Sequence, residues 1–503
     1  MTKSIKTDVV VAGAGGTGLA AAYAAAEHGL QVLVLEKQSQ IGGNTKISSG
    51  FFAVDSKEQR ERGMVMSKAE AIRQLTSYNH NISNGPLVHK IVNTAADTLA
   101  WIQKMGMHIK LNATADTTQF AHRNRDYQGG VYHMYQDKDG SYERIQQTLI
   151  DEGVKFEFNV TMQSIEQDST GQVIGITATD ANGEIIEVEA QATIVATGGF
   201  GGDSDLVAKT MHTRNLRQLG VPNNGEGLKA LVAAGGINID GTALIHAAQL
   251  AKSKVTKKSS KEHLAGFSNS ALTQLLLTPL FWVSPKGERF TNEDVVYDTV
   301  EWANAGYSVG GKYYFVVDQA TLDDFTENGG QLEVSKAGPG ANTEPGDFTK
   351  LANDSVAAGT AFKGNSLAEL ATAAGMDSNT LVQAVTAYNH NVHNRVDTDF
   401  AKSGQSLVYA VEQGPFYAFT AQVAYLGTVG GVRVDTNLNV LDDKFKPIPG
   451  LYTGGANAGG YYQGHCYPAY EGLASGFTWT SGRIAGTSAS EYIKIKNDKL
   501  IKK

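Results

Sequence analysis

Three glycines near the start of the chain have the spacing of a phosphate-binding loop. Gly13, Gly15 and Gly18 form the pattern G-x-G-x-x-G, and the acidic residue Glu36 follows about 20 residues later. Backbone amides at the start of a helix donate hydrogen bonds to phosphate oxygens. A carboxylate at the later position accepts hydrogen bonds from ribose hydroxyls. This combination predicts a binding site for a dinucleotide cofactor.

The segments around these residues predict the strand–helix–strand unit that such a site requires. Residues 8–12 and 31–35 are short Val- and Leu-rich runs typical of buried parallel strands. An alanine-rich run lies between them and ends at His28-Gly29, so it predicts a helix. The first glycine of the loop allows a tight turn, the second admits the pyrophosphate, and the third lets the helix pack on the strand.

A second glycine-rich loop distinguishes between the possible dinucleotides. It comprises residues 41–45 (IGGNT) and 48–50 (SSG), soon after Glu36. A nicotinamide site has no need of this loop, whereas the long diphosphate and ribityl chain of FAD must be followed by close backbone. The later strand end at residues 196–199 (ATGG) is also typical of flavoproteins. The pattern therefore favours FAD.

Composition excludes several classes of protein. The net charge is -8 and no basic stripe is visible, which argues against a nucleic-acid partner. Cys466 is the single cysteine, so an internal disulfide, a redox cysteine pair and a cysteine-based zinc site are excluded. No metal site is predicted. The sequence contains no apolar run long enough to span a bilayer and no room for a signal peptide, so we expect a cytoplasmic protein.

The chain of 503 residues is long enough for two domains. Residues 241–404 are more polar and irregular than their flanks, and buried-strand patterns return at 430–434 and 449–455. We therefore predict an α/β fold in which a Rossmann-type FAD-binding domain (1–240 and 405–503) is interrupted by an α+β capping domain (241–404). A last helix is predicted from about 472 to 485.

Motifs spread over nearly the whole chain resemble one flavoprotein group. The resemblance is to the FAD-binding fumarate reductase/succinate dehydrogenase superfamily, in its soluble branch with the 3-ketosteroid dehydrogenases. The matching segments are residues 13–18, 194–202, 286–293 (KGERFTNE), 429–432 and 448–455. This resemblance implies an FAD domain with an inserted capping domain that closes over the flavin.

The resemblance also extends the set of expected FAD-binding residues. It implies that Val160 contacts the adenine, that Asn457 lies near the ribityl chain or ring edge, and that residues 472–474 lie at the pyrimidine edge. A helix that begins there would stabilise negative charge on a reduced flavin. The residues predicted to bind non-covalent FAD are Gly13, Ala14, Gly15, Gly16, Thr17, Gly18, Glu36, Lys37, Gly42, Gly43, Asn44, Thr45, Ser49, Gly50, Val160, Ala196, Thr197, Gly198, Gly455, Asn457, Gly472, Leu473 and Ala474.

This chain departs from the fumarate reductases at three positions where they hold cations. Counting onward from the Arg289–Glu293 motif, the position of the proton-donating arginine holds Tyr297. The positions of a substrate-binding histidine and a second arginine hold Gly427 and Ala469. A dicarboxylate such as fumarate would then lack its counter-ions, unless Arg123 or His246 supplies them.

The replacements resemble the 3-ketosteroid dehydrogenases, which place a tyrosine after the motif and a Tyr-Pro pair before the last helix. Here these residues are Tyr297 and Tyr467-Pro468. By resemblance, Tyr297 moves a proton and Tyr467 polarises a carbonyl oxygen. A tyrosine carries a proton only with a lowered pKa or a polarising neighbour. His465 either relays protons or is structural.

The predicted function is that of an FAD-dependent oxidoreductase acting on a C–C or C=C bond beside a carbonyl or carboxyl group, as a reductase more than a dehydrogenase. Two alternatives stay open: a fumarate reductase, and a flavin-binding protein without turnover. The sequence carries neither a second dinucleotide motif nor a haem-binding Cys-x-x-Cys-His, so we expect a separate electron donor or acceptor. The small unsaturated substrate, the oligomeric state and the roles of His122, Arg123 and Tyr127 stay open.

Overall fold

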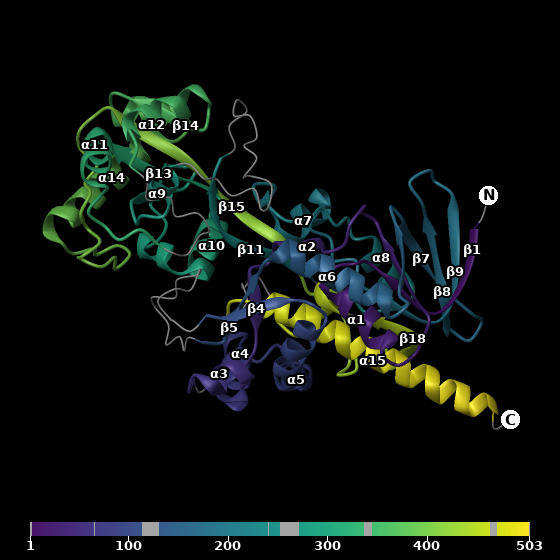
Figure 1. Cartoon of the computed structure of the whole chain (residues 1–503). Coiled ribbons are helices and arrows are strands. Elements are labelled where there is room, and N and C mark those ends of the chain that lie inside the picture. Colours follow the sequence, from purple (N-terminus) through teal and green to yellow (C-terminus); the bar gives the residue numbers. More distant parts are fainter. Residues whose placement is uncertain are drawn as a thin grey trace.

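The computed structural model of the chain describes residues 3–64, 66–112, 130–239, 241–251, 271–335, 345–462 and 470–501. Within these ranges the strands form two large sheets at opposite ends of the molecule, with helices packed around each (Figure 1). No helix in the described ranges is both long enough and apolar enough to cross a bilayer.

The first large sheet has eight strands, most of them parallel, and carries the glycine-rich loops. Its order is β17-β18-β9-β1-β2-β6, with β7 and β8 beside β9. Strand β1 (Lys3–Ala12) lies at its centre, parallel to β2 (Val32–Glu36) on one side and to β9 (Ile185–Val195) on the other. Strands β6 (Lys155–Phe158) and β18 (Pro447–Thr453) continue the parallel pattern. The other members are β7 (Thr161–Gln167), β8 (Val173–Thr179) and β17 (Asn439–Leu441). This arrangement confirms the predicted α/β fold.

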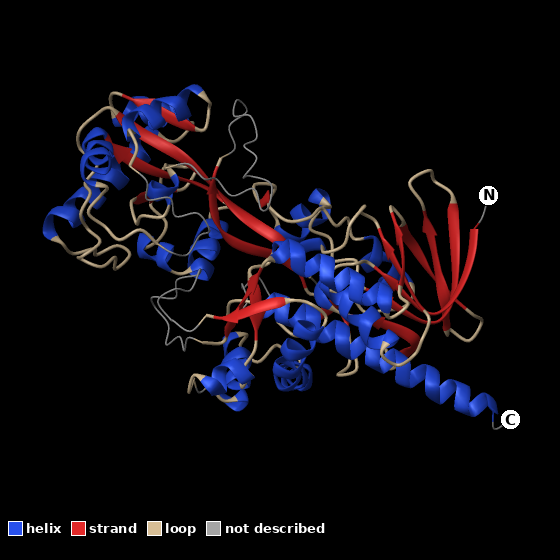
Figure 2. Ribbon diagram, in the orientation of Figure 1, coloured by secondary structure: helices blue, strands red, loops and turns tan. Residues whose placement is uncertain are grey.

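Two helices pack closely over this sheet because both are rich in small residues. Every residue of α1 (Gly16–Ala26) is buried, and α15 (Leu473–Ile501) runs alongside it. A Cβ atom added at Gly482 would lie 2.9 Å from the carbonyl carbon of Thr17, so the two backbones touch there. Figure 2 shows α15 extending beyond the sheet at the carboxyl end. It continues past the predicted end near 485 because Ala489 and Ile493 are also buried.

The remaining elements of this region surround the first sheet. Strands β3 (Gly50–Phe52), β5 (Tyr132–Gln136) and β4 (His108–Leu111) form a small antiparallel sheet, which α15 contacts through β3. Strands β16 (Val432–Arg433) and β19 (Ala458–Gly459) form a two-stranded pair. The helices are α2 (Gly43–Ile47), α3 (Lys57–Glu61), α4 (Lys68–Tyr78), α5 (Gly85–Lys104), α6 (Lys138–Asp151), α7 (Ser204–Met211), α8 (Glu226–Ala233) and the 3-10 helix η3 (Gly455–Asn457).

The second large sheet is built on one long strand, β15 (Phe416–Val429). Its first half pairs with β13 (Lys312–Asp318) and β14 (Ala361–Gly364), and its second half with β11 (Thr242–Leu250) and β10 (Arg217–Gln218). β15 therefore extends from the far end of the molecule to the region of the first sheet (Figure 1). Strands on both sides of the predicted boundaries at 240 and 405 share this sheet, and those boundaries stay a prediction. The other elements are α9 (Thr273–Leu276), β12 (Phe281–Val283), the 3-10 helix η2 (Glu293–Tyr297), α10 (Thr299–Ser308), α11 (Gln319–Asn328), α12 (Phe348–Ala357), α13 (Leu367–Ala374) and α14 (Ser378–Asn394).

A buried charge network holds helix η2 in this second region. Arg289 donates hydrogen bonds of 2.8 Å to the carboxylates of both Glu293 and Asp397. The ammonium of Lys402 lies 3.2 Å from Glu293 Oε2, and none of these four side chains is more than 5% exposed. Two buried cations thus balance two buried anions. Charged side chains are costly to bury unless they are paired in this way. The Arg289–Glu293 motif therefore fixes the start of the helix that ends at Tyr297.

Candidate active site

A cavity of about 390 Å³ lies where several parallel strands of the first sheet end. Its wall includes the loops after β1, β2 and β9 and the first residues of α1, α2 and α15. Ligands of open α/β folds bind in this place, outside the carboxyl ends of the strands. The sequence motifs for the cofactor therefore come together around one cavity.

The glycine-rich loop leaves space for a ligand at one glycine and packs tightly at the others. Gly13 has a φ of +103°, and a Cβ added there would lie 2.8 Å from the carbonyl carbon of Ala196. A Cβ added at Gly18 would lie 2.9 Å from the carbonyl carbon of Gly13. Gly15 has an ordinary φ of -75°, and the nearest atom to an added Cβ is 4.0 Å away. Neither backbone strain nor packing requires glycine at position 15, so the open space fits a cofactor that approaches the backbone.

Glu36 is held against the same loop. Its Oε2 accepts a hydrogen bond of 2.6 Å from the backbone amide of Ala14, and its Oε1 accepts one of 2.7 Å from Gln38. Burial raises the pKa of Glu36 above the ordinary value, and these two hydrogen bonds and the nearby Lys37 partly offset that effect. The carboxylate lines the cavity and is positioned to accept hydrogen bonds from a ribose.

The second glycine-rich loop joins the first to the rest of the cavity wall. The backbone amide of Gly42 donates to the carbonyl of Ala14 at 2.9 Å. Thr45 Oγ1 accepts a hydrogen bond of 3.1 Å from the amide of Gly16, and Asn44 Oδ1 accepts one of 2.7 Å from Val221. The loop therefore fixes both the start of α1 and a segment that follows β10.

Helix α15 begins at the wall of the same cavity. Gly472, which precedes it, has a φ of +73°, and its carbonyl accepts a hydrogen bond of 3.0 Å from the amide of Phe52. Leu473, Ala474 and Ser475 line the cavity, so the first backbone amides of the helix lie at its wall. The start of a helix stabilises negative charge, as a reduced flavin ring requires.

Most of the predicted cofactor residues line this cavity. They are Gly13, Gly15, Gly16, Thr17, Glu36, Lys37, Gly43, Asn44, Thr45, Ser49, Val160, Ala196, Thr197, Gly198, Gly472, Leu473 and Ala474. The predicted residues that do not line it are Ala14, Gly18, Gly42, Gly50, Gly455 and Asn457. Asn457 is fully buried, accepts a hydrogen bond of 2.9 Å from the Gly199 amide, and donates one of 2.9 Å to Thr197 Oγ1. It therefore fixes the strand end that lines the cavity.

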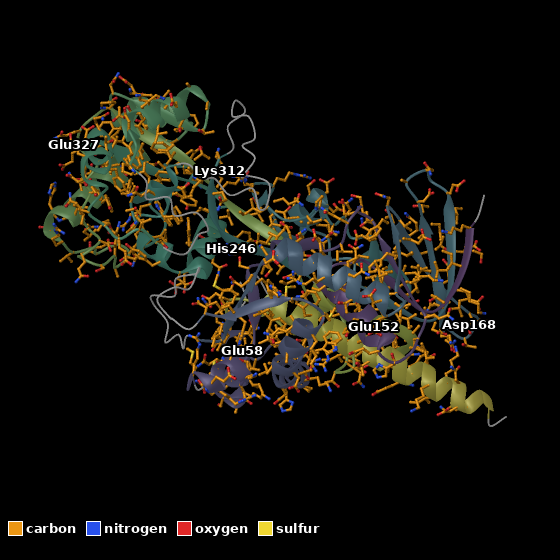
Figure 3. The ribbon with its side chains drawn as sticks, in the orientation of Figure 1. Glu58, Glu152, Asp168, His246, Lys312 and Glu327 are labelled. Atoms are coloured by element: carbon orange, nitrogen blue, oxygen red, sulfur yellow. The ribbon has the colours of Figure 1, made fainter. Side chains whose placement is uncertain are left out.

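The cavity also contains residues that carry no sequence motif. They include the aromatic and apolar residues Tyr132, Tyr462, Tyr470, Leu244 and Leu426, together with His246. His246 lies on β11 near the middle of the molecule (Figure 3). Burial lowers the pKa of His246 to about 4, so its imidazole is neutral at neutral pH. These residues come from distant parts of the chain, and only the folded sheets bring them together.

The residues predicted to act in catalysis either do not line this cavity or lie outside the described residues. Tyr297 is buried in the second region, its hydroxyl donates a hydrogen bond of 2.8 Å to the carbonyl of Glu333, and it does not line the cavity. Tyr467 and His465 lie outside the described residues, as do Ala469, His122, Arg123 and Tyr127. Their roles stay predictions.

Gly427 lines the cavity. By resemblance, the fumarate reductases hold a histidine at this position. A Cβ added at Gly427 would lie 2.9 Å from Nδ2 of Asn44. That distance is shorter than a comfortable contact, and Asn44 is itself fixed by its hydrogen bond to Val221. A larger side chain at position 427 would therefore require Asn44 to move.

Comparison with known proteins gives a family and several relatives. Residues 8–468 match the family described as FAD binding domain. The vinyl phenol reductase of Lactiplantibacillus plantarum is 28% identical over 508 residues, which cover 98% of this chain and 98% of that protein. A fumarate reductase (cytochrome) of Shewanella frigidimarina is 27% identical over 497 residues, covering 97% of this chain and 77% of that protein. The 3-ketosteroid delta1-dehydrogenase of Sterolibacterium denitrificans superposes with a TM-score of 0.74 at 18% identity, over 97% of this chain and 99% of that one, and this likeness shows the fold alone.

Proposed function

The chain belongs to the FAD-binding domain family, and on that premise we propose that it reduces an activated carbon–carbon double bond in a small organic substrate. Non-covalently bound FAD would exchange a hydride with the substrate through N5 of the flavin. The vinyl phenol reductase matches this chain over nearly its whole length, which supports a reductase that acts on an uncharged conjugated alkene. The double bond would lie beside a carbonyl or carboxyl group or be conjugated with a ring.

The main support for this proposal is the scarcity of unpaired positive charge in the described part of the cavity wall. Among the described residues that line the cavity, Lys37 is the single lysine or arginine. Its ammonium lies 2.6 Å from Glu226 Oε1, so its charge is already balanced. His246 is neutral at neutral pH because burial lowers its pKa to about 4. A charge-assisted hydrogen bond to a carboxylate contributes about 1.5–3 kcal/mol, and a dicarboxylate would need several. The described part of the wall therefore offers no unpaired lysine or arginine to a second carboxylate.

The aromatic part of the wall suits an uncharged conjugated alkene. Tyr132, Tyr462 and Tyr470 line the cavity, and burial raises the pKa of each hydroxyl above its usual value. They are therefore neutral at physiological pH and present ring faces and hydrogen-bond donors without charge. By the family resemblance, Tyr297 would supply the proton at the second carbon and Tyr467 would polarise the oxygen of the activating group. Tyr297 does not line the cavity in this structure, so this role requires its hydroxyl to leave the Glu333 carbonyl and reach the substrate.

Electrons would come from a separate donor. The Shewanella frigidimarina relative is named for a cytochrome, and this chain covers 77% of its length. The sequence of this chain has no haem-binding motif and no second dinucleotide loop. We propose that a separate reductant transfers electrons to FAD.

Reoxidation of the reduced protein tests the proposal. The flavin is reduced with dithionite without oxygen, and its absorbance is followed after addition of 4-vinylphenol, an enone, methyl cinnamate, cinnamate, urocanate or fumarate. Rapid reoxidation by an uncharged alkene, with slow reoxidation by fumarate, is the expected result. Rapid reoxidation by fumarate alone would favour a fumarate reductase. A flavin that no alkene reoxidises would indicate binding without turnover.

A further inference from the structure

An ion pair joins two residues of the cavity wall, one of which follows Glu36 in the chain. Lys37 follows strand β2, and Glu226 is the first residue of α8, so the two residues are far apart in the sequence. Lys37 Nζ lies 2.6 Å from Glu226 Oε1, and both side chains line the cavity. The pair therefore connects the first strand–helix unit of the sheet with the segment that covers it.

This part of the cavity wall faces solvent. The side chains of Lys37 and Glu226 are 35% and 27% exposed, and the neighbouring Gln38, which also lines the cavity, is exposed. Burial tends to raise the pKa of Glu226, but the hydrogen bond and charge of Lys37 together with nearby backbone hydrogen bonds lower that pKa below its ordinary value. Glu226 is therefore charged at neutral pH, and salt in the solvent reaches the partly exposed pair.

The segment that carries Glu226 is tied down on its other side. The amide of Val221 donates to Asn44 Oδ1 at 2.7 Å, and Asn223 Nδ2 donates to the carbonyl of Gly198 at 3.0 Å. A Cβ added at Gly227 would lie 2.7 Å from Cγ1 of Val195, so the start of α8 packs directly on the end of β9. The backbone of this segment is therefore held in place. The contact between the Lys37 and Glu226 side chains can open without breaking these other contacts.

We infer that the Lys37–Glu226 ion pair is a latch that controls the release and entry of FAD. Glu36, the predicted ribose-binding carboxylate, precedes Lys37 in the chain, and all three residues line the cavity. A cofactor that leaves through this solvent-facing part must pass between the two side chains, so they must separate first. The inference rests on FAD binding alone and does not depend on the substrate or on Tyr297.

The rate of FAD release tests the latch. The holoprotein is diluted, and release is followed by the rise in flavin fluorescence at NaCl concentrations from about 0.02 M to about 0.5 M. The wild-type rate should rise with salt. Lys37→Met and Glu226→Gln should each release FAD about three- to fivefold faster at low salt, as expected for loss of a partly exposed ion pair. Both variants should also lose most of the salt dependence.

A double variant and a matched control make the test specific. Lys37→Met/Glu226→Gln should release FAD no faster than either single variant, because one interaction is lost in all three. Lys3→Met breaks the Lys3–Glu157 pair, a 2.7 Å contact on the same sheet that does not line the cavity, and should release FAD as the wild type does. Lys37 is also a predicted FAD contact, so the double variant decides between the two roles. Additive effects of the two single changes would overturn the latch, because the two side chains would then act on FAD release independently of their ion pair. A wild-type salt slope in Glu226→Gln, or an equal change of slope in Lys3→Met, would overturn it too.

Discussion

Gly15 and Gly42 lie beside each other as an isolated parallel bridge, and the carbonyl oxygen of Gly42 is the nearest atom to a side chain added at Gly15. That distance is 4.0 Å, so a Cβ atom at position 15 makes only an ordinary contact with the protein. We predict that Gly15→Val folds normally but loses its flavin, because the added methyl groups occupy the path of the pyrophosphate. The flavin absorbance of the purified protein and its circular dichroism separate these two effects.

Gly18→Val is the matched comparison within the same loop. A Cβ at Gly18 would meet the backbone of Gly13, so this change should disrupt packing of α1 on β1 and lower the melting temperature. Gly15→Val with full FAD content would contradict the assignment of the cavity. Release of FMN instead of FAD on acid treatment of the wild type would contradict it as well.

A second prediction concerns His246 and pH. Its folded-state pKa is lowered to about 4 by burial, whereas a histidine in the unfolded chain titrates near 6.5. The unfolded state therefore binds the proton first, so stability is fully present above about pH 6.5 and is lost as the pH falls toward 4. Between about pH 7 and about pH 5 this group should contribute a loss of about 2 kcal/mol.

Urea unfolding at the two pH values measures this loss. His246→Gln should unfold with a smaller difference in free energy between about pH 7 and about pH 5. Burial also lowers the pKa of His133 to about 4, so part of the pH dependence should persist in that variant. An unchanged pH dependence in His246→Gln would mean that the imidazole is not buried in solution.

The third prediction concerns substrate charge. Cinnamate and methyl cinnamate differ in one carboxylate, so they form a matched pair for the cavity wall. The ester should be reduced at least as efficiently as the acid, because the described wall offers no unpaired lysine or arginine to the carboxylate. Comparison of kcat/KM for the two substrates measures the difference. A tenfold or larger preference for the acid, about 1.4 kcal/mol, would point to a cation such as Arg123.

The sequence predicts the cofactor half of the site much better than the substrate half. The loop at Gly13–Gly18 and the carboxylate of Glu36 act through backbone geometry and hydrogen bonds that one strand–helix–strand unit provides. Such local units leave a pattern in the sequence. Tyr132, Tyr462 and His246 share no local pattern, because they come from different sheets and segments and meet only in the folded chain.

Resemblance to a family predicts where a functional residue stands in the chain more reliably than it predicts which atoms that residue contacts. Asn457 is predicted to lie near the ribityl chain or ring edge, and this stays a prediction. In the structure its side-chain amide is bonded to Gly199 and Thr197, and it does not line the cavity. The sequence does not define the last residue of α15, because the helical spacing of apolar residues becomes less regular after 485. Burial of Ile493 on the sheet, a tertiary contact, extends the helix.

The last prediction concerns Tyr297 and depends on the proposed function. Tyr297→Phe keeps the ring, which packs in the aromatic core of the second region, and removes only the hydroxyl. Loss of the hydrogen bond to Glu333 should cost about 1 kcal/mol of stability. If the hydroxyl delivers the proton, kcat should fall about 10²–10⁴-fold while FAD content is unchanged. KM should change little, since the proton moves only in the transition state.

Tyr409→Phe is a suitable control, because it removes a second hydroxyl that is bonded within the same region. The Tyr409 hydroxyl donates to Asp324 at 2.6 Å and accepts from the amide of Gln331 at 2.6 Å, and it does not line the cavity. This variant should lose stability but keep kcat. Equal losses of kcat in both variants would show that Tyr297 acts only through the structure of the second region. Wild-type kcat in Tyr297→Phe would remove Tyr297 from the mechanism and make Tyr467 or His465 the next candidate. If Tyr467 polarises the substrate oxygen, Tyr467→Phe should lower kcat about 10²–10³-fold.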